Sequence, residues 1–271
     1  MEMRREGRDN LVVLKLGGSV ITEKERYKTP NVDSIDRLAK EIADAGVKRL
    51  MIVHGGGSYG HPLAEQYKIK EGYREASQIE GLSKTHQAML ELNKLVVEAL
   101  ICHNIAAFSV TPSSCVVTKA GRIETFYDDA LQILLNTEFV PVLFGDTVLD
   151  TEIGFTILSG DQLVVALVAK FNANRLVFGV DVGGLYTADP KTDTSAQLIS
   201  HTTFEELKRT LHNIRGSDTT DVTGGMAGKI LELTNIANAD IQAIIVNATK
   251  EGNIYKALKG EEVVGTSIRK E

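Results

Sequence analysis

The sequence predicts an α/β protein whose central sheet is mostly parallel and covered by helices on both faces. Short apolar runs alternate with segments of helical periodicity along the chain, which is the pattern of successive βαβ units. Glycine-rich loops follow the first two apolar runs directly, as expected where a strand ends and a helix begins. The 271 residues, of which 43% are apolar and 24% charged, are enough for one well-buried core.

The expected strands are apolar runs with turn residues on either side. They occupy residues 11–16, 49–53, 106–110, 139–144, 175–180 and 241–246. Residues 112–125 are expected to form one or two further short strands around a turn at Ala120-Gly121. The loop over residues 181–200 is long and rich in Gly, Asp and Thr, and long loops inside compact domains are usually functional.

The expected helices have apolar residues at helical spacing and polar residues that cap the first turn. They occupy residues 31–45, 77–103, 128–136, 159–171, 204–212, 225–239 and 251–258. Asn31 or Asp33 is expected to cap the first of these helices, and Ser159 or Asp161 the fourth.

Composition narrows the class of protein. The formal net charge of −6 argues against a broad nucleic-acid-binding surface. Cys102 and Cys115 form no CxxC pair, so neither a zinc site nor a disulfide framework is indicated, and two free thiols fit a reducing compartment. No apolar run approaches the ~18 residues of a membrane span, and the charged first residues do not resemble a signal peptide. We therefore expect a cytoplasmic protein with no membrane partner.

Lys15 lies near the end of the first apolar strand, directly before Gly17 and Gly18. In open parallel sheets the carboxyl ends of the strands form the ligand crevice, and glycines there allow backbone N–H groups to turn toward an anion. The alternative is a lysine on an edge strand whose ammonium reaches solvent.

A second glycine-rich loop, Gly55-Gly56-Gly57, follows the second strand and opens a helix. Such a loop lets the backbone approach an oxyanion, and the helix N-terminus adds partial positive charge. His61 follows about one turn later, within reach of the same anion, whereas His54 before the loop is more simply a structural residue. The alternatives are a tight turn and a solvated surface histidine. The pattern is neither a Walker A loop nor a dinucleotide-binding fingerprint.

Three further segments in the second half carry charged or polar side chains near predicted strand ends and helix starts. Asp161 opens a helix, where it either caps the helix or orients nearby lysines. The segment from Asp181 to Pro190 follows a strand, and its polar side chains are candidates to meet a nucleoside, although Asp-Pro is also a good turn. Thr223-Gly224-Gly225-Met226 precedes a helix that carries Lys229. The start of this helix would be a second helix N-terminus for an anion, and Lys229 would be a second cation.

Together and in this order, these segments resemble the amino acid kinase superfamily over nearly the whole chain. They are Lys15 to Ser19, the glycine loop after His54, Gly160-Asp161, Asp181 to Pro190, and Thr223 to Met226 with Lys229. The resemblance implies a three-layer αβα sandwich with a mostly parallel central sheet, formed by a single domain over residues 1–271. It implies acceptor binding by an N-terminal lobe of about residues 1–150 and ATP binding by a C-terminal lobe of about residues 151–271.

Within the superfamily, the segment from Gly57 to Pro62 resembles the isopentenyl phosphate kinase branch, as do residues 21–24, Thr85-His86 and residues 221–226. In that branch the histidine that matches His61 holds the acceptor phosphate. The resemblance implies ATP-dependent phosphorylation of isopentenyl phosphate to isopentenyl diphosphate, for isoprenoid precursor synthesis, with Mg²⁺ and as a homodimer. A fosfomycin-type phosphonate kinase and a non-catalytic nucleotide-binding sensor on the same fold are the alternatives.

A phosphate monoester is already an anionic nucleophile, so its phosphorylation needs positioning and charge relief rather than a strong base. The catalytic residues expected are Lys15, Lys24, His61, Asp161 and Lys229. The acceptor-binding residues expected are Gly55, Gly56, Gly57, Ser58, Gly60, His61 and Gly160. The ATP-binding residues expected are Lys15, Gly17, Gly18, Ser19, Asp181, Gly184, Tyr186, Asp189, Gly225 and Lys229.

Each charged residue has a distinct expected role. Lys15 bridges the transferring group and ATP, Lys24 and Lys229 clamp the phosphate chain, and Asp161 holds the lysines. Mg²⁺ is expected to stay on the ATP phosphates with few protein ligands, since it keeps much of its water. An apolar acceptor tail is expected to lie against the helix over residues 77–100, at Ile79, Leu82 or Met89.

Overall fold

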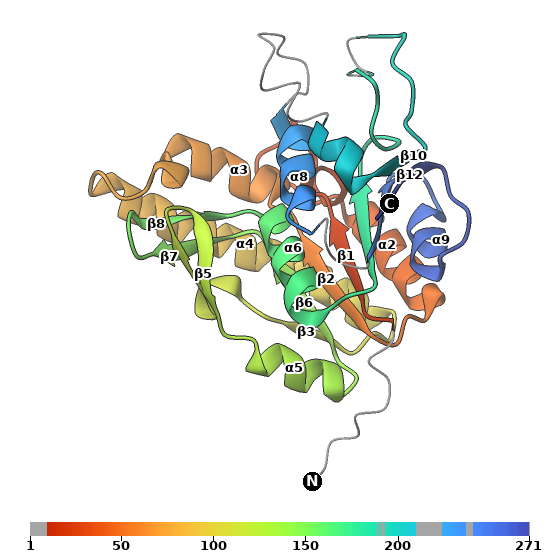
Figure 1. The fold of residues 1–271 in the computed structure, drawn as a ribbon. Helices are drawn as coiled ribbons and strands as arrows, with labels where there is room; N and C mark the ends of the chain where they lie inside the picture. Colours follow the sequence, from red (N-terminus) through yellow and green to blue (C-terminus); the bar gives the residue numbers. More distant parts are fainter. Residues whose placement is uncertain (1–9, 189, 191–192, 210–223, 237–240, 271) are drawn as a thin grey trace.

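The structure, a computed structural model, describes residues 10–188, 190, 193–209, 224–236 and 241–270. Within these residues an eight-stranded sheet runs through the middle of the molecule in the order β10-β12-β11-β9-β1-β2-β6-β3 (Figure 1). All neighbouring strands are parallel except β11 and β12. The strands are β1 (Val12–Leu16), β2 (Leu50–His54), β3 (Ala107–Ser109), β6 (Val140–Phe144), β9 (Arg175–Val180), β10 (His201–Thr203), β11 (Gln242–Asn247) and β12 (Gly265–Arg269).

Alternate residues of each central strand enter two separate cores, because successive side chains of a strand point to opposite faces. Val13 packs with helices α5, α6 and α8, whereas Leu14 packs with the helices on the other face. This arrangement confirms the predicted three-layer αβα sandwich. The first layer holds α5 (Asp129–Asn136), α6 (Gly160–Phe171) and α8 (Gly224–Thr234), and the second holds α1 (Gly18–Ile21), α2 (Val32–Ala45), α3 (Gly57–Gln66), α4 (Ser77–Cys102) and α9 (Asn253–Lys259).

A smaller four-stranded sheet, in the order β5-β4-β7-β8, lies beside the large one (Figure 1). Its strands are β4 (Val116–Lys119), β5 (Arg122–Phe126), β7 (Asp146–Asp150) and β8 (Gly154–Leu158), and two short 3₁₀ turns, Ile69–Glu71 and Pro112–Ser114, lie nearby. Ala120 and Gly121 form the turn of the β4–β5 hairpin with φ angles of 48° and 77°, as a two-residue hairpin turn requires. The buried Asp150 carboxylate holds this turn, accepting from the Ala120 N–H at 3.1 Å and the Gly121 N–H at 2.8 Å.

The long elements agree with the sequence prediction, and Asn31 and Ser159 cap α2 and α6 as expected. The predicted helix over residues 204–212 is helical from 204 to 209, and its remainder lies outside the described residues. The predicted helix 225–239 ends earlier, at Thr234, with a turn at residues 235–236, and residues 237–239 lie outside the described part of the chain. The sequence had not indicated α1, β7, β8, β10 or β12, all of which are short. Among the described helices, none has both the length and the apolar character needed to cross a bilayer.

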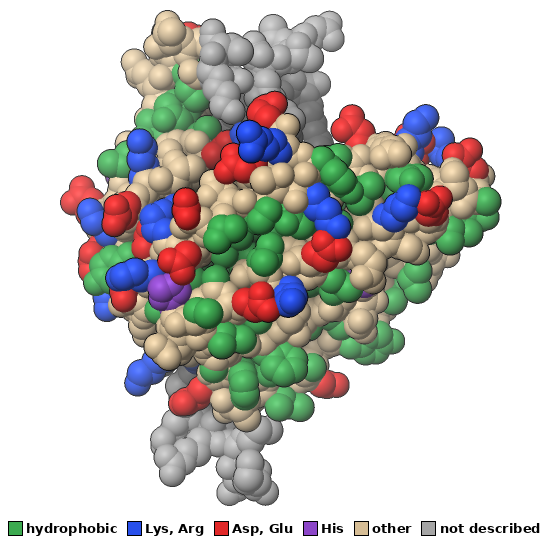
Figure 2. All heavy atoms as spheres, turned by 180° about the vertical axis from the view of Figure 1, so that it is seen from behind, with side chains coloured by type: hydrophobic (Ala, Val, Ile, Leu, Met, Phe, Trp, Pro, Cys, Tyr) green, Lys and Arg blue, Asp and Glu red, His purple; other side chains and the backbone are tan. Residues whose placement is uncertain are grey.

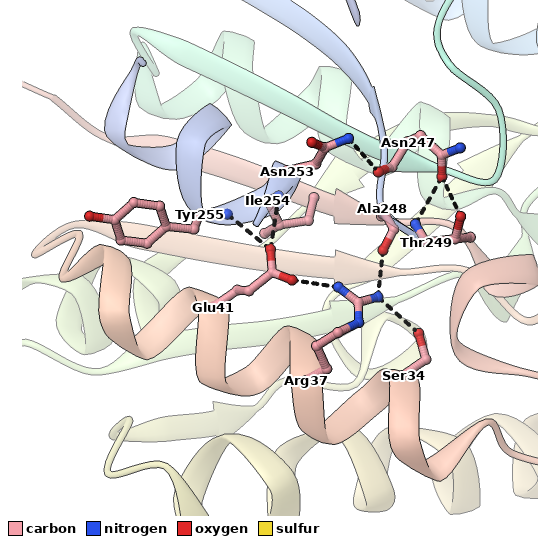
Figure 3. Close-up of polar contacts among 9 residues, drawn as sticks. All are labelled: Ser34, Arg37, Glu41, Asn247, Ala248, Thr249, Asn253, Ile254 and Tyr255. Carbon is pink, nitrogen blue, oxygen red and sulfur yellow. Dashed lines mark hydrogen bonds and ion pairs between the residues drawn. The ribbon is translucent and has the colours of Figure 1, made fainter. Parts of the chain in front are cut away.

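Helix α9 depends on α2 for its N-terminal cap (Figure 3). The Glu41 carboxylate of α2 accepts hydrogen bonds from the N–H groups of Ile254 at 3.0 Å and Tyr255 at 3.2 Å, which have no partner within their own helix. Arg37 holds that carboxylate at 2.5 Å and donates to the Ala248 carbonyl at 2.6 Å. Elements more than 200 positions apart are thereby fixed to one another behind the sheet.

Candidate active site

A cavity of about 770 Å³ opens at the carboxyl ends of the neighbouring strands β9, β1, β2 and β6. Loops after these strands line it, and both halves of the chain contribute. The carboxyl ends of parallel strands are the usual ligand crevice of such sheets. The cavity therefore lies where the sequence placed its glycines and lysines.

Two buried lysines share one carboxylate at the floor of this cavity. The ammonium of Lys15, on β1, lies 3.0 Å from Oδ1 of Asp161, and the ammonium of Lys229, on α8, lies 2.8 Å from the same oxygen. Lys15 is 8% exposed and Lys229 5% exposed. The ammonium of Lys229 also lies 4.6 Å from the centre of the Phe178 ring. The structure thus brings together three of the predicted catalytic residues.

This cluster carries an excess of positive charge. Burial alone raises the pKa of Asp161, but Lys15 and Lys229 outweigh it and hold that pKa below its ordinary value. Burial and the neighbouring Lys15 together lower the pKa of Lys229 to about 8. Because one carboxylate faces two ammonium groups, a bound anion would relieve the repulsion between the lysines.

The two glycine loops contact each other backbone to backbone beside this cluster. A Cβ on Gly18 would lie 2.1 Å from the Gly57 nitrogen, and Gly57 has a φ of +48°, so side chains are excluded at both positions. The helix that begins at Gly57 has no earlier turn to accept its first N–H groups. Among the hydrogen bonds of the described residues, none uses the amides of Gly56 or Gly57. These amides are free to bind an anion in the cavity.

His61 lies one turn into α3, is an exposed residue and belongs to the lining of the same cavity. The surrounding protein and the charge of Lys15 lower the pKa of His61, so the imidazole is neutral at pH 7 and offers one N–H donor. His54, by contrast, is completely buried; it stacks on Phe144 and contacts the Asn93 side chain at 3.2 Å. Burial lowers the pKa of His54 to about 4, so this imidazole is neutral inside the core.

Lys24 lies in the loop after α1 and contacts Asp181 in the loop after β9. The sequence assigned the two residues to ATP separately, and the structure joins them as an ion pair at the cavity wall. The side chain of Lys24 is 48% exposed, so an incoming phosphate chain can compete with Asp181 for its ammonium.

Most of the predicted site residues line the cavity. They are Lys15, Gly17, Gly18, Ser19, Lys24, Gly55, Gly56, Gly57, Ser58, Gly60, His61, Gly160, Asp161, Asp181, Gly184, Tyr186 and Lys229. Gly225 lies in the first turn of α8, and Asp189 lies outside the described residues. Ser58 lines the cavity, but its N–H donates to the Thr22 hydroxyl at 3.0 Å and is therefore engaged within the protein.

The apolar part of the lining was largely missed by sequence reasoning. Of the three residues expected along α4, only Met89 lines the cavity, and Ile79 is 54% exposed. The lining residues outside every segment that the sequence analysis linked to the site are Ala64, Gly145, Asp146, Ile157, Leu158 and Val180, and Ser159, also in the lining, had been expected only as a helix cap. Spacing along α4 favours Thr85 and Met89 as one helix face, but Asp146 and Ile157 lie on β7 and β8, which gave no clear sequence signal.

Asp146 is a buried carboxylate in this lining. It accepts from its neighbour Thr147 at 2.8 Å and contacts Nδ1 of His86 at 2.9 Å. The hydrogen bond to Asp146 raises the pKa of His86 despite partial burial. Asp146 and His86 thus compensate each other where α4 meets the small sheet.

The described residues contain no group of three or more His, Cys, Asp or Glu side chains able to hold a metal ion. Each carboxylate in the cavity lining already contacts a cation or a histidine: Asp161 contacts two lysines, Asp181 contacts Lys24 and Asp146 contacts His86. A divalent cation in this cavity would depend mainly on ligand phosphates and water for its coordination.

Comparison with known proteins identifies the relatives of this chain. The amino acid kinase family matches residues 10–247. The isopentenyl phosphate kinase of Methanothermobacter thermautotrophicus is 39% identical over 266 residues, covering 95% of this chain and 98% of that protein, and that of Methanocaldococcus jannaschii is 35% identical over 268 residues with the same coverage. A crystal structure of isopentenyl phosphate kinase superposes with a TM-score of 0.84 at 35% identity, covering 96% of this chain and 100% of that one.

Proposed function

This chain belongs to the amino acid kinase family, and from that membership we propose that it transfers the terminal phosphoryl group of ATP to isopentenyl phosphate, forming isopentenyl diphosphate. The relatives named isopentenyl phosphate kinase match it over nearly their whole length. The observation that carries the proposal is the pair of buried lysines on Asp161, placed in one cavity with His61 and the open glycine amides.

The transfer follows from these charges. An oxygen of the acceptor phosphate attacks the γ-phosphorus of ATP while the bond from that phosphorus to the ADP oxygen breaks, so that no proton has to be removed from the nucleophile. Two polyanions must approach each other, and Lys15, Lys229 and the amides of Gly56 and Gly57 offset their repulsion. Asp161 fixes the lysines before either substrate arrives, so little reorganisation remains for the reaction step.

The two substrates are assigned to opposite sides of Lys15. Residues of about 1–150 hold the acceptor through His61 and the loop 55–57, and residues of about 151–271 hold ATP through Asp181, Tyr186 and Lys229. Lining residues from both lobes meet at Lys15, which supports this division. Mg²⁺ accompanies ATP and supplies charge neutralisation on its phosphates when bound.

The apolar lining near His61 suits a hydrocarbon tail. Pro62, Ala64, Met89 and Ile157 are apolar residues of the cavity lining, and Pro62 and Ala64 follow His61 on α3. A small five-carbon tail buried there gains the usual free energy of apolar transfer, about 25 cal/mol for each Å² removed from water. A phosphonate antibiotic with polar substituents would gain less from the same wall.

An assay of ADP release with several acceptors tests the proposed function. We expect turnover with isopentenyl phosphate and, at a rate set by pocket fit, with dimethylallyl phosphate. Fosfomycin and acetylglutamate serve as comparison acceptors. Preference for fosfomycin would identify a phosphonate kinase, and ATP binding without turnover on any acceptor would identify a nucleotide-binding sensor; either result contradicts the proposal.

His61→Ala is expected to weaken isopentenyl phosphate binding with a smaller effect on kcat. A hydrogen bond to a charged group contributes about 1.5–3 kcal/mol, which corresponds to roughly 10- to 10²-fold in the dissociation constant. Isothermal titration of the acceptor measures this change. His201→Ala, at an exposed histidine of β10, is the matched control and should bind normally. Unchanged acceptor affinity in His61→Ala would remove His61 from the phosphate site.

The chain is further proposed to be a cytoplasmic homodimer that binds no nucleic acid. The dimer is proposed to form at β3: among the described residues no strand pairs with the outer edge of β3, where Phe108 is 49% exposed and lies near Phe139 in an edge-to-face contact.

The surface charges support the absence of nucleic-acid binding. Figure 2 shows charges of both signs interspersed with apolar side chains, rather than one basic field, on the face turned away from α6 and α8. Cys102 and Cys115 are free thiols, as a reducing compartment allows. A solution mass of one chain would contradict the dimer.

A further inference from the structure

The β4–β5 hairpin contacts the helix that carries Lys229. Arg122, at the start of β5, binds both carboxylate oxygens of Glu232 on α8, at 2.5 Å through Nη1 and 2.9 Å through Nη2. The Glu232 side chain is 11% exposed, whereas that of Arg122 is 56% exposed. A carboxylate this buried requires a hydrogen-bonded cation, and the two-pronged geometry fixes its orientation as well as its charge.

The backbone on either side of Arg122 is held by the helix that carries Asp161. Gln162, the next residue of α6, accepts from the Ile123 N–H at 2.9 Å and donates to the Gly121 carbonyl at 3.1 Å. The side-chain amide of Gln162 therefore holds the backbone on both sides of residue 122, as the backbone of a neighbouring strand would. Asp150 holds the hairpin turn from the other direction. The hairpin is thus a fixed support rather than a loose loop.

These contacts connect the two helices whose side chains meet in the active site. Lys229 and Glu232 are three residues apart and so lie on the same face of α8. Lys229 attaches that face to Asp161, and Glu232 attaches it to Arg122. The residues on either side of Arg122 are hydrogen-bonded to the Gln162 side chain. Two attachments about one turn apart define both the rotation of α8 and its position along its own axis.

We propose that Arg122 is a positioning residue for phosphoryl transfer, which holds α8 through Glu232 so that Lys229 stays against Asp161 at the place where the phosphates bind. The inference rests on the proposed kinase function and assigns a role in it to residues that do not line the cavity. Without the Arg122 fork, the buried carboxylate of Glu232 would turn toward water and rotate α8 with it. Lys229, which the nearby Lys15 repels, would then leave Asp161.

Arg122→Lys separates position from charge, because lysine keeps the positive charge but lacks the planar fork. We expect kcat to fall about tenfold or more, since misplacing a reacting group by even 1 Å can cost ~10²-fold, while the affinity for isopentenyl phosphate stays unchanged. Glu232→Gln, which keeps the side-chain shape, is expected to reproduce the loss and carries the test if Arg122→Lys fails to fold. Lys119→Ala, at an exposed position of the same hairpin, is the matched control and should retain full activity.

A second readout needs no catalysis. The pH dependence of acetic anhydride labelling at Lys229, followed by mass spectrometry on the ATP-free protein, measures the pKa of that amine. Asp161 of α6 and Lys15 of β1 are the charged groups that face it. In Arg122→Lys the pKa of Lys229 is expected to rise from about 8 toward the ordinary 10.5 as α8 releases the lysine to water. The labelling is done well below the unfolding temperature of each variant, because an unfolded chain would also show the ordinary pKa.

The outcomes are distinct. Lower kcat together with a raised pKa of Lys229 supports the proposal. Unchanged kcat, or lower thermal stability and lower kcat with the pKa of Lys229 unmoved, overturns it. Failure of the wild-type protein to use any acceptor would refute the proposed function instead, and the labelling comparison would still decide whether Arg122 positions Lys229.

Discussion

Lys15→Ala is expected to lower kcat by about 10²- to 10³-fold, the usual cost of losing one preorganised donor at developing charge. Lys15 is 8% exposed at the carboxyl end of the central strand, and Asp161 holds its ammonium at 3.0 Å. No other described residue reaches Asp161 from β1, so the loss cannot be replaced from the same strand. The binding of isopentenyl phosphate, which we assign chiefly to His61, should change less than kcat does.

The fold should tolerate this substitution, because Asp161 keeps Lys229 as its partner at 2.8 Å. Lys15 is also one of the groups that lower the pKa of Lys229, so the pKa of Lys229 should rise in Lys15→Ala. Steady-state kinetics and the amine titration check both points. Lys40→Ala, at an exposed lysine paired with Asp44, is the matched control. A loss confined to the Michaelis constants, with kcat intact, would show that Lys15 binds substrate without assisting transfer.

Asp161→Asn is expected to reduce both stability and turnover. The substitution keeps the side-chain shape but leaves two buried ammonium groups without a counter-charge. Breaking a buried pair by removing one partner typically costs about 3–5 kcal/mol. Chemical denaturation at pH 7 measures the loss, and kcat should fall because the lysines are no longer held side by side. Asp128→Asn, which breaks the more exposed pair with Lys170, should cost less than about 1 kcal/mol.

The pH dependence of this loss gives a further check. The pKa of Lys229 is about 8 in the folded wild type and 10.5 in an unfolded chain, so between these values the unfolded state binds more protons and stability from this group rises with pH. Without Asp161 the pKa of Lys229 falls further, and the penalty for charging it at pH 7 grows. The difference in unfolding free energy between wild type and Asp161→Asn should therefore shrink from pH 7 to pH 10. A difference that stays constant with pH would mean that Lys229 is not the source of the instability.

The alternation of elements could be predicted because each central strand is apolar on both faces. Val12 to Leu16 is buried at every position. A short apolar run of this kind, followed directly by glycines, indicates a buried strand of a parallel sheet. The anion-binding part of the site could be predicted as well, because lysines and glycines at successive strand ends converge at one edge of a parallel sheet. The glycines have a second role that no local pattern reveals, because Gly18 and Gly57 lie against each other across nearly 40 positions of sequence.

The remainder of the site could not be predicted, because it depends on contacts between residues that are far apart in the sequence. Ile157 and Asp146 lie on short strands of the small sheet. In such strands the alternation of apolar and polar residues is weak, and the residues that pack against them are distant in sequence. Arg122 and Glu232 are 110 positions apart, and each resembles an ordinary surface charge when taken alone. Only the folded chain shows that one of them is buried and that the other compensates it.

The position of β1 determines how the two lobes can be separated. This strand, near the start of the chain, pairs with β2 on one side and with β9 on the other, so that Val12 lies opposite both Leu50 and Arg175. A cut near residue 150 would leave a long apolar strand edge open on each fragment, and open edges of this kind promote aggregation. Two separately expressed halves could therefore restore the fold only if they associate before either half aggregates.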